Sequence, residues 1–147
     1  MQMAALFLSL RPLQAACTFI AARRQLVIDL AVLVLSCAPL VAQDTARALI
    51  QVESGFRKYA ISSAGARGYM QVMPFWARLI GDGNDRALFH AQTNLRFGCV
   101  ILRHYLDIER GDLFMALGRY NGSRGKRDYP DKVFAARTRW QWTDPGA

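Results

Sequence analysis

A glutamate in an unusual setting lies in the segment LIQVESGF. The surrounding residues predict a helix over residues 45–54, in which Leu49 and Ile50 lie four and three positions before Glu53. At about 3.6 residues per turn, these three side chains share one helix face. A carboxylate among apolar neighbours is poorly solvated when charged, which favours its protonated form. A glutamate that is protonated near neutral pH can act as a general acid, for example on a glycosidic oxygen.

A second catalytic carboxylate is not evident. Most glycosidases use two, but the only other glutamate, Glu109, adjoins Arg110 at a predicted helix end and is interpreted as solvated. Asp82 and Asp85 lie in the turn GDGNDR, where turn and capping roles explain them. One carboxylate suffices if the substrate supplies its own nucleophile. A purely structural alternative, an ion pair of Glu53 with an arginine at the helix end, stays open.

The elements that must position Glu53 are all predicted to be helices, because no stretch alternates between apolar and polar residues. Glycines and serines predict a structured loop over residues 55–68. In the longest helix, Leu95, Cys99 and Leu102 form an apolar stripe, and Thr93 or Asn94 is expected to cap it. The fold class is therefore all-α. Besides residues 45–54, the predicted helices are 74–80, 87–91, about 95–109, 113–120 (capped by Asp112) and 129–140.

The first 42 residues differ from the rest of the chain. Arg23 and Arg24 precede an apolar run, Leu26–Ala42, which is interrupted only by Asp29 and ends in small residues. This layout is typical of a signal peptide or membrane anchor, and Cys37 loosely fits a lipidation site. We predict a leader over 1–42 and a catalytic domain over 43–147. The alternative is that the apolar run forms buried helices of the fold.

The charge pattern points to an anionic partner. The formal net charge is +8, and residues 43–147 hold 16 basic and 10 acidic side chains. Such an excess suits an acidic polysaccharide, a cell envelope or nucleic acid. The basic residues are scattered and no recognition-helix motif occurs, so no nucleic acid is expected. His90 and His104 lack a ligand motif, so no metal site is expected.

Three separated motifs together resemble one family. The segment ALIQVESGFRKYAISSAGARGYMQVMP is similar to the catalytic segment of soluble lytic transglycosylases, which have a goose-type lysozyme-like fold. That pattern is a helix ending in Glu-Ser, a Ser- and Gly-containing loop, then Gly-Leu-Met-Gln, a hydrophobic residue and Met-Pro. This chain has Glu53-Ser54, Ser62 and Gly68-Tyr69-Met70-Gln71-Val72-Met73-Pro74. NLRFGCVILRHYL resembles the family's Asn-headed helix, and ALGRYNGS resembles its Ala-Tyr-Asn-Ala-Gly motif. The resemblance covers about residues 46–135.

The resemblance implies roles for six residues. Glu53 is the single catalytic acid and base, and Tyr120 hydrogen-bonds or orients it. Structural alternatives remain, since Met73 could be core, Ser62 could close a turn and Tyr120 could serve packing alone. The residues implied to line the sugar cleft are Ser62, Gln71, Met73, Tyr120 and Asn121.

The chain departs from the family pattern in three places. Tyr69 replaces a leucine, and Arg119 replaces an alanine before Tyr-Asn; both are expected on the cleft rim, where Arg119 would contact an anionic polymer. The family also has a helix before the glutamate helix, where this chain has LSCAPLVAQDTA. Either the domain lacks that helix or the segment from Leu26 replaces it.

The resemblance implies a peptidoglycan lytic transglycosylase. Such an enzyme cleaves the β-1,4 bond between N-acetylmuramic acid and N-acetylglucosamine and leaves 1,6-anhydromuramic acid ends, without metal or cofactor. We expect a monomer in the periplasm or cell envelope, acting on peptidoglycan strands, with membrane attachment through the leader as an option. The alternatives are a lysozyme-like hydrolase and a non-catalytic basic module that binds cell wall or nucleic acid. Endo or exo action and the biological role are left open.

Overall fold

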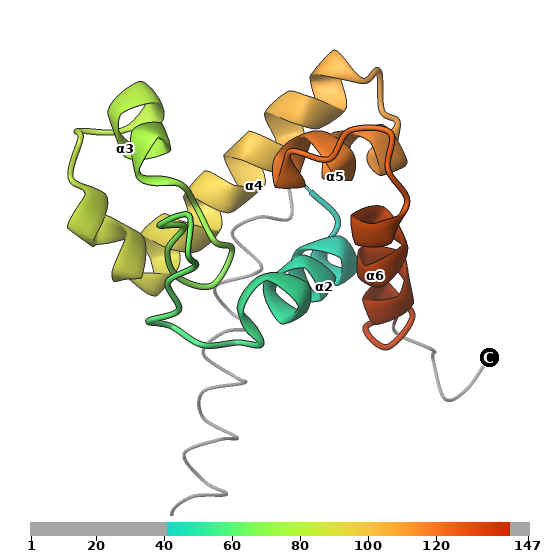
Figure 1. Ribbon diagram of the computed structural model, residues 1–147, viewed down its shortest axis with the longest axis horizontal. Coiled ribbons are helices and arrows are strands. Elements are labelled where there is room, and N and C mark those ends of the chain that lie inside the picture. Colours follow the sequence, from blue (N-terminus) through green and yellow to red (C-terminus); the bar gives the residue numbers. More distant parts are fainter. Residues whose placement is uncertain (1–40, 142–147) are drawn as a thin grey trace, which may run out of the picture. The chain divides into compact units, whose positions relative to one another are not determined.

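The described part of this computed structural model, residues 41–141, is built from helices (Figure 1). Within that part there are five α-helices, one 3-10 helix and no strand, which confirms the all-α prediction. Apart from Val41 and Ala42, the predicted leader lies outside the described residues. No helix among the described residues has both the length and the apolarity needed to cross a membrane. In chain order the elements are α2 (Gln43–Ser54), α3 (Pro74–Ile80), η1 (Asp85–Phe89), α4 (Ala91–Ile108), α5 (Leu113–Asn121) and α6 (Asp128–Arg137).

Helix α2 carries the apolar face that the sequence predicts. Ala46, Leu49 and Ile50 are fully buried. The helix ends at Gly55, whose φ of 57° is the left-handed conformation that glycine adopts readily, and whose N–H donates to the Gln51 carbonyl. Glu53 therefore lies in the last turn of a helix that is anchored by its apolar side.

Helix α6 lies beside α2 (Figure 1). Arg137 pairs with Asp44 at 2.6 Å, and the Trp140 indole N–H donates to the Gln51 amide oxygen at 2.9 Å. Val133 is fully buried. These contacts fix α6 along α2, so that a side chain near the start of α6 can reach the end of α2.

Helix α4 begins earlier than predicted. It starts at Ala91, so neither Thr93 nor Asn94 caps it, and that prediction is wrong. The apolar stripe is confirmed, because Leu95, Cys99 and Leu102 are fully buried. The predicted cap of α5 is also confirmed, since the Asp112 carboxylate accepts the Met115 N–H at 3.1 Å.

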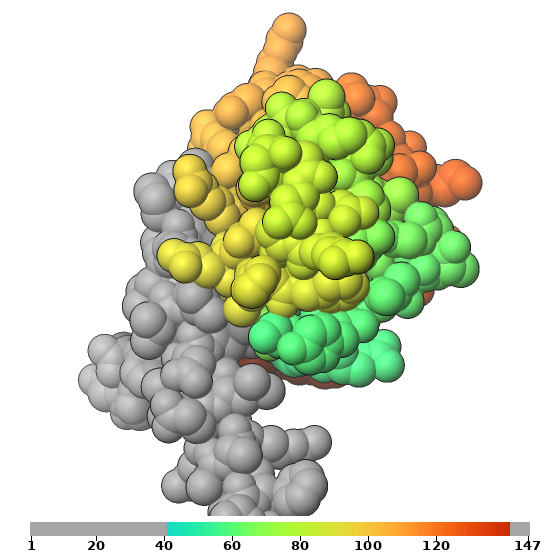
Figure 2. Space-filling model, turned by 90° about the vertical axis from the view of Figure 1, so that its left-hand side faces the viewer, coloured from blue at the N-terminus to red at the C-terminus, as the bar shows by residue number. Residues whose placement is uncertain are grey.

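The chain between α2 and α3 is ordered by its own backbone. Arg67 forms antiparallel bridges with both Ile61 and Val72. The Arg67 and Val72 N–H groups each donate to the other residue's carbonyl at 3.0 Å, and the Gly68 N–H donates to the Ala60 carbonyl at 2.9 Å. In Figure 2 this loop, in green, adjoins the yellow-green chain of α3 and η1. The predicted structured loop, 55–68, thus contains one small antiparallel bridge, and a second joins its Arg67 to Val72 just beyond it.

One buried amide ties this loop to the helices. Asn94 on α4 is fully buried; its oxygen accepts the Met70 N–H, and its nitrogen donates to the carbonyls of Arg67 and Leu88, all at 2.8 Å. The loop passes so close that a β-carbon on Gly68 would lie 2.4 Å from the Asn94 nitrogen. Asn94 therefore joins the loop, η1 and α4 in one network.

Replacing this amide should destabilise the fold. Asn94→Ala would leave three backbone groups without their partner, and each buried unsatisfied group costs about 1–3 kcal/mol. We expect the free energy of unfolding, from urea denaturation, to fall by about 3 kcal/mol or more. Gln92→Ala, at an exposed position of the same helix, is the control and should change it by less than about 0.5 kcal/mol. A loss below about 1 kcal/mol in Asn94→Ala would contradict this role.

Candidate active site

Glu53 is hydrogen-bonded to a tyrosine that lies 76 residues further along the chain. Its side chain is half-buried, and its Oε1 accepts a hydrogen bond from the hydroxyl of Tyr129 in the first turn of α6. Tyr129 is itself buried. The sequence does not mark this partner, because Tyr129-Pro130-Asp131 indicates only the start of a helix.

Two opposing effects set the pKa of Glu53. Burial, the larger effect, raises it, and the hydrogen bond from Tyr129, which favours the carboxylate, lowers it. The net result is a pKa raised from 4.5 to about 7. None of the ion pairs within residues 41–141 involves Glu53. The structure therefore favours a poorly solvated glutamate over the ion-paired alternative.

Glu53 opens onto a pocket of about 710 Å³. Two of the predicted sugar-binding residues, Ser62 and Gln71, line the same pocket, together with residues 57–61. Among residues 41–141, Glu53 is the only carboxylate in its lining. Met73, Tyr120 and Asn121 are not among the lining residues, so the structure brings together three of the six predicted residues.

Local hydrogen bonds decide which polar atoms of Ser62 and Gln71 are left for a ligand. The Ser62 hydroxyl oxygen accepts the Ala66 N–H at 3.0 Å, so its proton can still be donated. The Gln71 amide nitrogen donates to the carbonyls of Ala60 and Gly68 at 3.2 and 2.9 Å, which leaves its oxygen as an acceptor. Gln71 has a φ of 48°, rare for a residue with a side chain. The pocket wall thus presents a donor and an acceptor in fixed positions.

Tyr120 has a different partner from the one predicted. Its hydroxyl donates to the Met70 carbonyl at 2.7 Å, so the expected hydrogen bond to Glu53 is made by Tyr129 instead. Burial, followed by the charge of Glu53, raises the pKa of Tyr120 well above its ordinary value, so the phenol stays protonated. From α5, Tyr120 holds the backbone next to Gln71, which makes its influence on the pocket indirect.

The two remaining predicted residues do not line the pocket. Asn121 is exposed at the end of α5, where its oxygen accepts the Ser123 hydroxyl at 3.0 Å. Met73 precedes α3 in an extended conformation and is half-buried. Their sugar-binding roles stay predictions.

Most of the chain matches a known protein family. The family model described as transglycosylase SLT domain matches residues 33–142, well over half of the chain. The chain belongs to the transglycosylase SLT domain family. The match confirms the family resemblance seen in the sequence. It begins at residue 33, inside the predicted leader, so the boundary at 42 remains a prediction.

Two solved structures share the fold of this SLT domain. The 70 kDa soluble lytic transglycosylase from Escherichia coli is 21% identical, with a TM-score of 0.52 over 67% of this chain. An inactive mutant of the lytic transglycosylase Slt from Pseudomonas aeruginosa is also 21% identical, with a TM-score of 0.54 over 74% of this chain. The chain spans only 16% and 20% of those proteins. At this identity the likeness concerns the fold alone.

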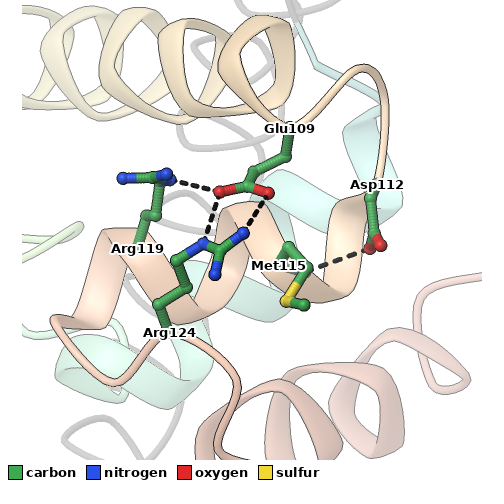
Figure 3. A network of polar contacts seen from close by, with 5 residues as sticks. All are labelled: Glu109, Asp112, Met115, Arg119 and Arg124. Atoms are coloured by element: carbon green, nitrogen blue, oxygen red, sulfur yellow. Dashed lines mark hydrogen bonds and ion pairs between the residues drawn. The ribbon is translucent and has the colours of Figure 1, made fainter.

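Glu109, the other glutamate of the SLT domain, has a structural role (Figure 3). Glu109, expected to be solvated, has only 8% of its side chain exposed. Arg124 donates to both its oxygens, at 2.7 and 3.0 Å, and Arg119 donates to Oε1. The two arginines hold the pKa of Glu109 at about 2. Arg119 is thus ion-paired and does not line the pocket, which corrects its expected position on the cleft rim.

The close approach behind this ion-pair network needs a glycine. A β-carbon on Gly118 in α5 would lie 2.9 Å from the Arg124 Cα. The network therefore joins the end of α4 to the end of α5 and to the turn that leads into α6. Among the described residues, no three His, Cys, Asp or Glu side chains gather in a way that could hold a metal ion.

Removing the Tyr129 hydroxyl should raise the pKa of Glu53. Tyr129→Phe deletes a hydrogen bond that favours the carboxylate but keeps the ring, so the pKa should move further above 7. Because the chain has only two glutamates, carbon NMR of the labelled side-chain carboxyls can follow Glu53 directly. Tyr59→Phe, in the same pocket lining, should leave the pKa in place. A lower pKa in Tyr129→Phe would contradict the assigned hydrogen bond.

Glu109 should stabilise the domain in a pH-dependent way. Its folded pKa of about 2 lies below the ordinary value of 4.5, so its contribution is complete above pH 4.5 and is lost as pH falls towards 2. Glu109→Gln should therefore lower the free energy of unfolding at pH 7, and the difference from wild type should shrink below pH 4.5. Asp107→Asn, which breaks an exposed pair with Arg103, is the control and should change little. A pH-independent deficit in Glu109→Gln would count against the ion pairs.

Proposed function

We propose that this SLT domain is a peptidoglycan lytic transglycosylase and that Glu53 is its single catalytic acid and base. The observation that carries the proposal is one half-buried carboxyl with a pKa of about 7, facing a pocket to which the described part of the chain contributes no other carboxylate. Family membership gives the substrate class. A pKa near the operating pH lets one group both donate and accept a proton.

The proposed reaction cleaves the β-1,4 bond between N-acetylmuramic acid and N-acetylglucosamine. Protonated Glu53 donates its proton to the glycosidic oxygen, and the bond from that oxygen to the muramoyl C1 breaks. The muramoyl C6 hydroxyl then attacks C1, and the Glu53 carboxylate takes the hydroxyl proton. The 1,6-anhydro ring closes and Glu53 is protonated again, so no water is consumed.

The positions of the aspartates support this one-carboxylate route. Asp82 accepts the Asn84 N–H at 2.9 Å in its turn, and Asp85 pairs with Arg67 at 3.1 Å. Neither lines the pocket. A hydrolase with two carboxylates would need one of them near Glu53 to activate water.

The polar groups left on the pocket wall suit an acetylated sugar. The Ser62 proton and the Gln71 oxygen can bind the hydroxyl and acetamido groups beside the scissile bond. Met73, Tyr120 and Asn121 are proposed to contribute to the same cleft through more distant contacts, with Tyr120 acting through the Met70 backbone.

Peptidoglycan implies a place in the cell envelope. We infer that residues 1–42 direct export to the periplasm or envelope, because a basic pair precedes an apolar run that ends in small residues. The net charge of +8 would favour association with the anionic wall. We expect the protein to act as a monomer, either soluble or attached to the membrane through this segment.

Glu53→Gln should abolish turnover of purified peptidoglycan. The amide keeps the shape and the Tyr129 contact but cannot deliver a proton, and losing general-acid catalysis costs about 10² to 10⁴ in rate. Because one residue makes both transfers, we expect the upper end. Mass spectrometry of the wild-type products should find 1,6-anhydro ends. Asp82→Asn is the control and should keep near wild-type activity; reducing ends, or a dead Asp82→Asn enzyme that still folds, would instead indicate a hydrolase.

A further inference from the structure

Two cations share the pocket with Glu53 and have no acidic partner. Arg57 and Lys58 both line it. None of the ion pairs within residues 41–141 involves either side chain. Lys58 instead lies over the ring of Tyr59, with its nitrogen 5.1 Å from the ring centroid. If the pocket bound only uncharged sugars, these two positive charges would have no evident function in it.

The backbone after α2 is shaped in a way that places these cations. Gly55 and Phe56 are both left-handed, with φ of 57° and 63°. This conformation is uncommon for a residue with a bulky side chain, and Phe56 is held by an edge contact with Trp140, 5.6 Å between centroids. The two residues turn the chain sharply, so that the Arg57 Nε donates to the Ser54 carbonyl at 2.9 Å.

That hydrogen bond also caps α2, which is the simplest structural role for Arg57. It uses only the Nε–H group of the guanidinium, however, and the four N–H donors of the two terminal nitrogens remain. The cap therefore orients Arg57 without saturating it. A guanidinium held in this way matches the paired oxygens of a carboxylate.

The cations do not serve to ionise Glu53. The pKa of Glu53 is set by burial and by Tyr129, with no contribution from Arg57 or Lys58. A cation close enough to lower that pKa would leave less of Glu53 protonated near neutral pH. Neither cation forms an ion pair with Glu53, so both remain available to meet negative charge on the ligand.

We propose that Arg57 and Lys58 form a carboxylate-binding edge of the pocket, which favours glycan chains that carry a carboxylate near the cleaved bond. This inference rests on the proposed function, since it names a feature of the same substrate. The carboxylate can come from the lactyl group of peptide-free muramic acid or from the peptide stem. A chitin oligosaccharide has the same sugar backbone without either group.

Binding to the full chain in the Glu53→Gln background tests this edge without turnover. The probes are chitin oligosaccharide and muramic-acid-containing chains of equal length, with and without peptide, measured by calorimetry. Arg57→Gln/Lys58→Gln should weaken binding of carboxylate-bearing chains by about five- to thirtyfold and remove most of its salt dependence. Binding of the chitin chain should change less than about twofold.

The matched control removes the same charge elsewhere. Arg86→Gln/Arg96→Gln alters two exposed arginines outside the pocket lining and should leave all three affinities nearly unchanged. Because Arg57 also caps α2, Lys58→Gln alone is the second variant and should weaken carboxylate-bearing chains by about two- to fivefold. An equal loss in the control, an equal loss for chitin, or no loss at all would overturn the proposal.

Further outcomes distinguish the lactyl carboxylate from the peptide-stem carboxylate. They also distinguish failure of the binding edge from failure of the proposed transglycosylase function. A loss confined to peptide-free chains assigns the lactyl carboxylate, and a loss confined to peptide-bearing chains assigns the stem. If wild-type enzyme forms no anhydro ends while the carboxylate preference behaves as expected, the proposed chemistry fails and the binding edge stands. If anhydro ends form and the double variant binds all chains like its control, only the binding edge fails.

Discussion

The site depends on one buried amide that satisfies three backbone groups. Part of the segment after α2, including Met70 and Val72, is buried, and unpaired N–H and C=O groups are costly there. Asn94 binds the Met70 N–H and the carbonyls of Arg67 and Leu88. Gln71, next to Met70, is thereby held on the pocket wall. Without this amide the loop would need water where α4 now packs, and the wall facing Glu53 would lose its fixed shape.

The chemistry of Glu53 depends on a balance between burial and one phenol. Burial alone would push its pKa higher and make it a weaker acid. The Tyr129 hydroxyl moderates this effect, giving about 7. Tyr129 can reach Glu53 only because α6 is fixed along α2 by Arg137 and Trp140. The acid strength of Glu53 is therefore set by the packing of α6 against α2 as well as by α2 itself.

Periodicity predicted most of the fold and only part of the site. It predicted the helix of Glu53, the stripe of α4 and the absence of strands, because a helix face follows from local spacing. It could not show which distant segment meets that face. The sequence predicts Asn94 as a helix cap, yet it lies inside α4 and joins that helix to η1 and to the loop after α2. Tyr129 lies 76 residues from Glu53, and no local pattern marks such a pair. The family resemblance supplied Ser62 and Gln71, which local spacing alone would not.

Glu53 and Glu109 have the same side chain, but their different environments give them different roles. Glu109 adjoins Arg110 in sequence, but its partners are Arg119 and Arg124, which keep it charged and join the ends of α4 and α5 to the turn before α6. Tyr120 directly follows Arg119, and Tyr129 lies in the first turn of α6, the helix after Arg124. The charged glutamate therefore braces the segments that carry both tyrosines. These tyrosines in turn hold the pocket wall and the neutral glutamate. Burial keeps Glu53 largely protonated near neutral pH, whereas the two arginines keep Glu109 charged.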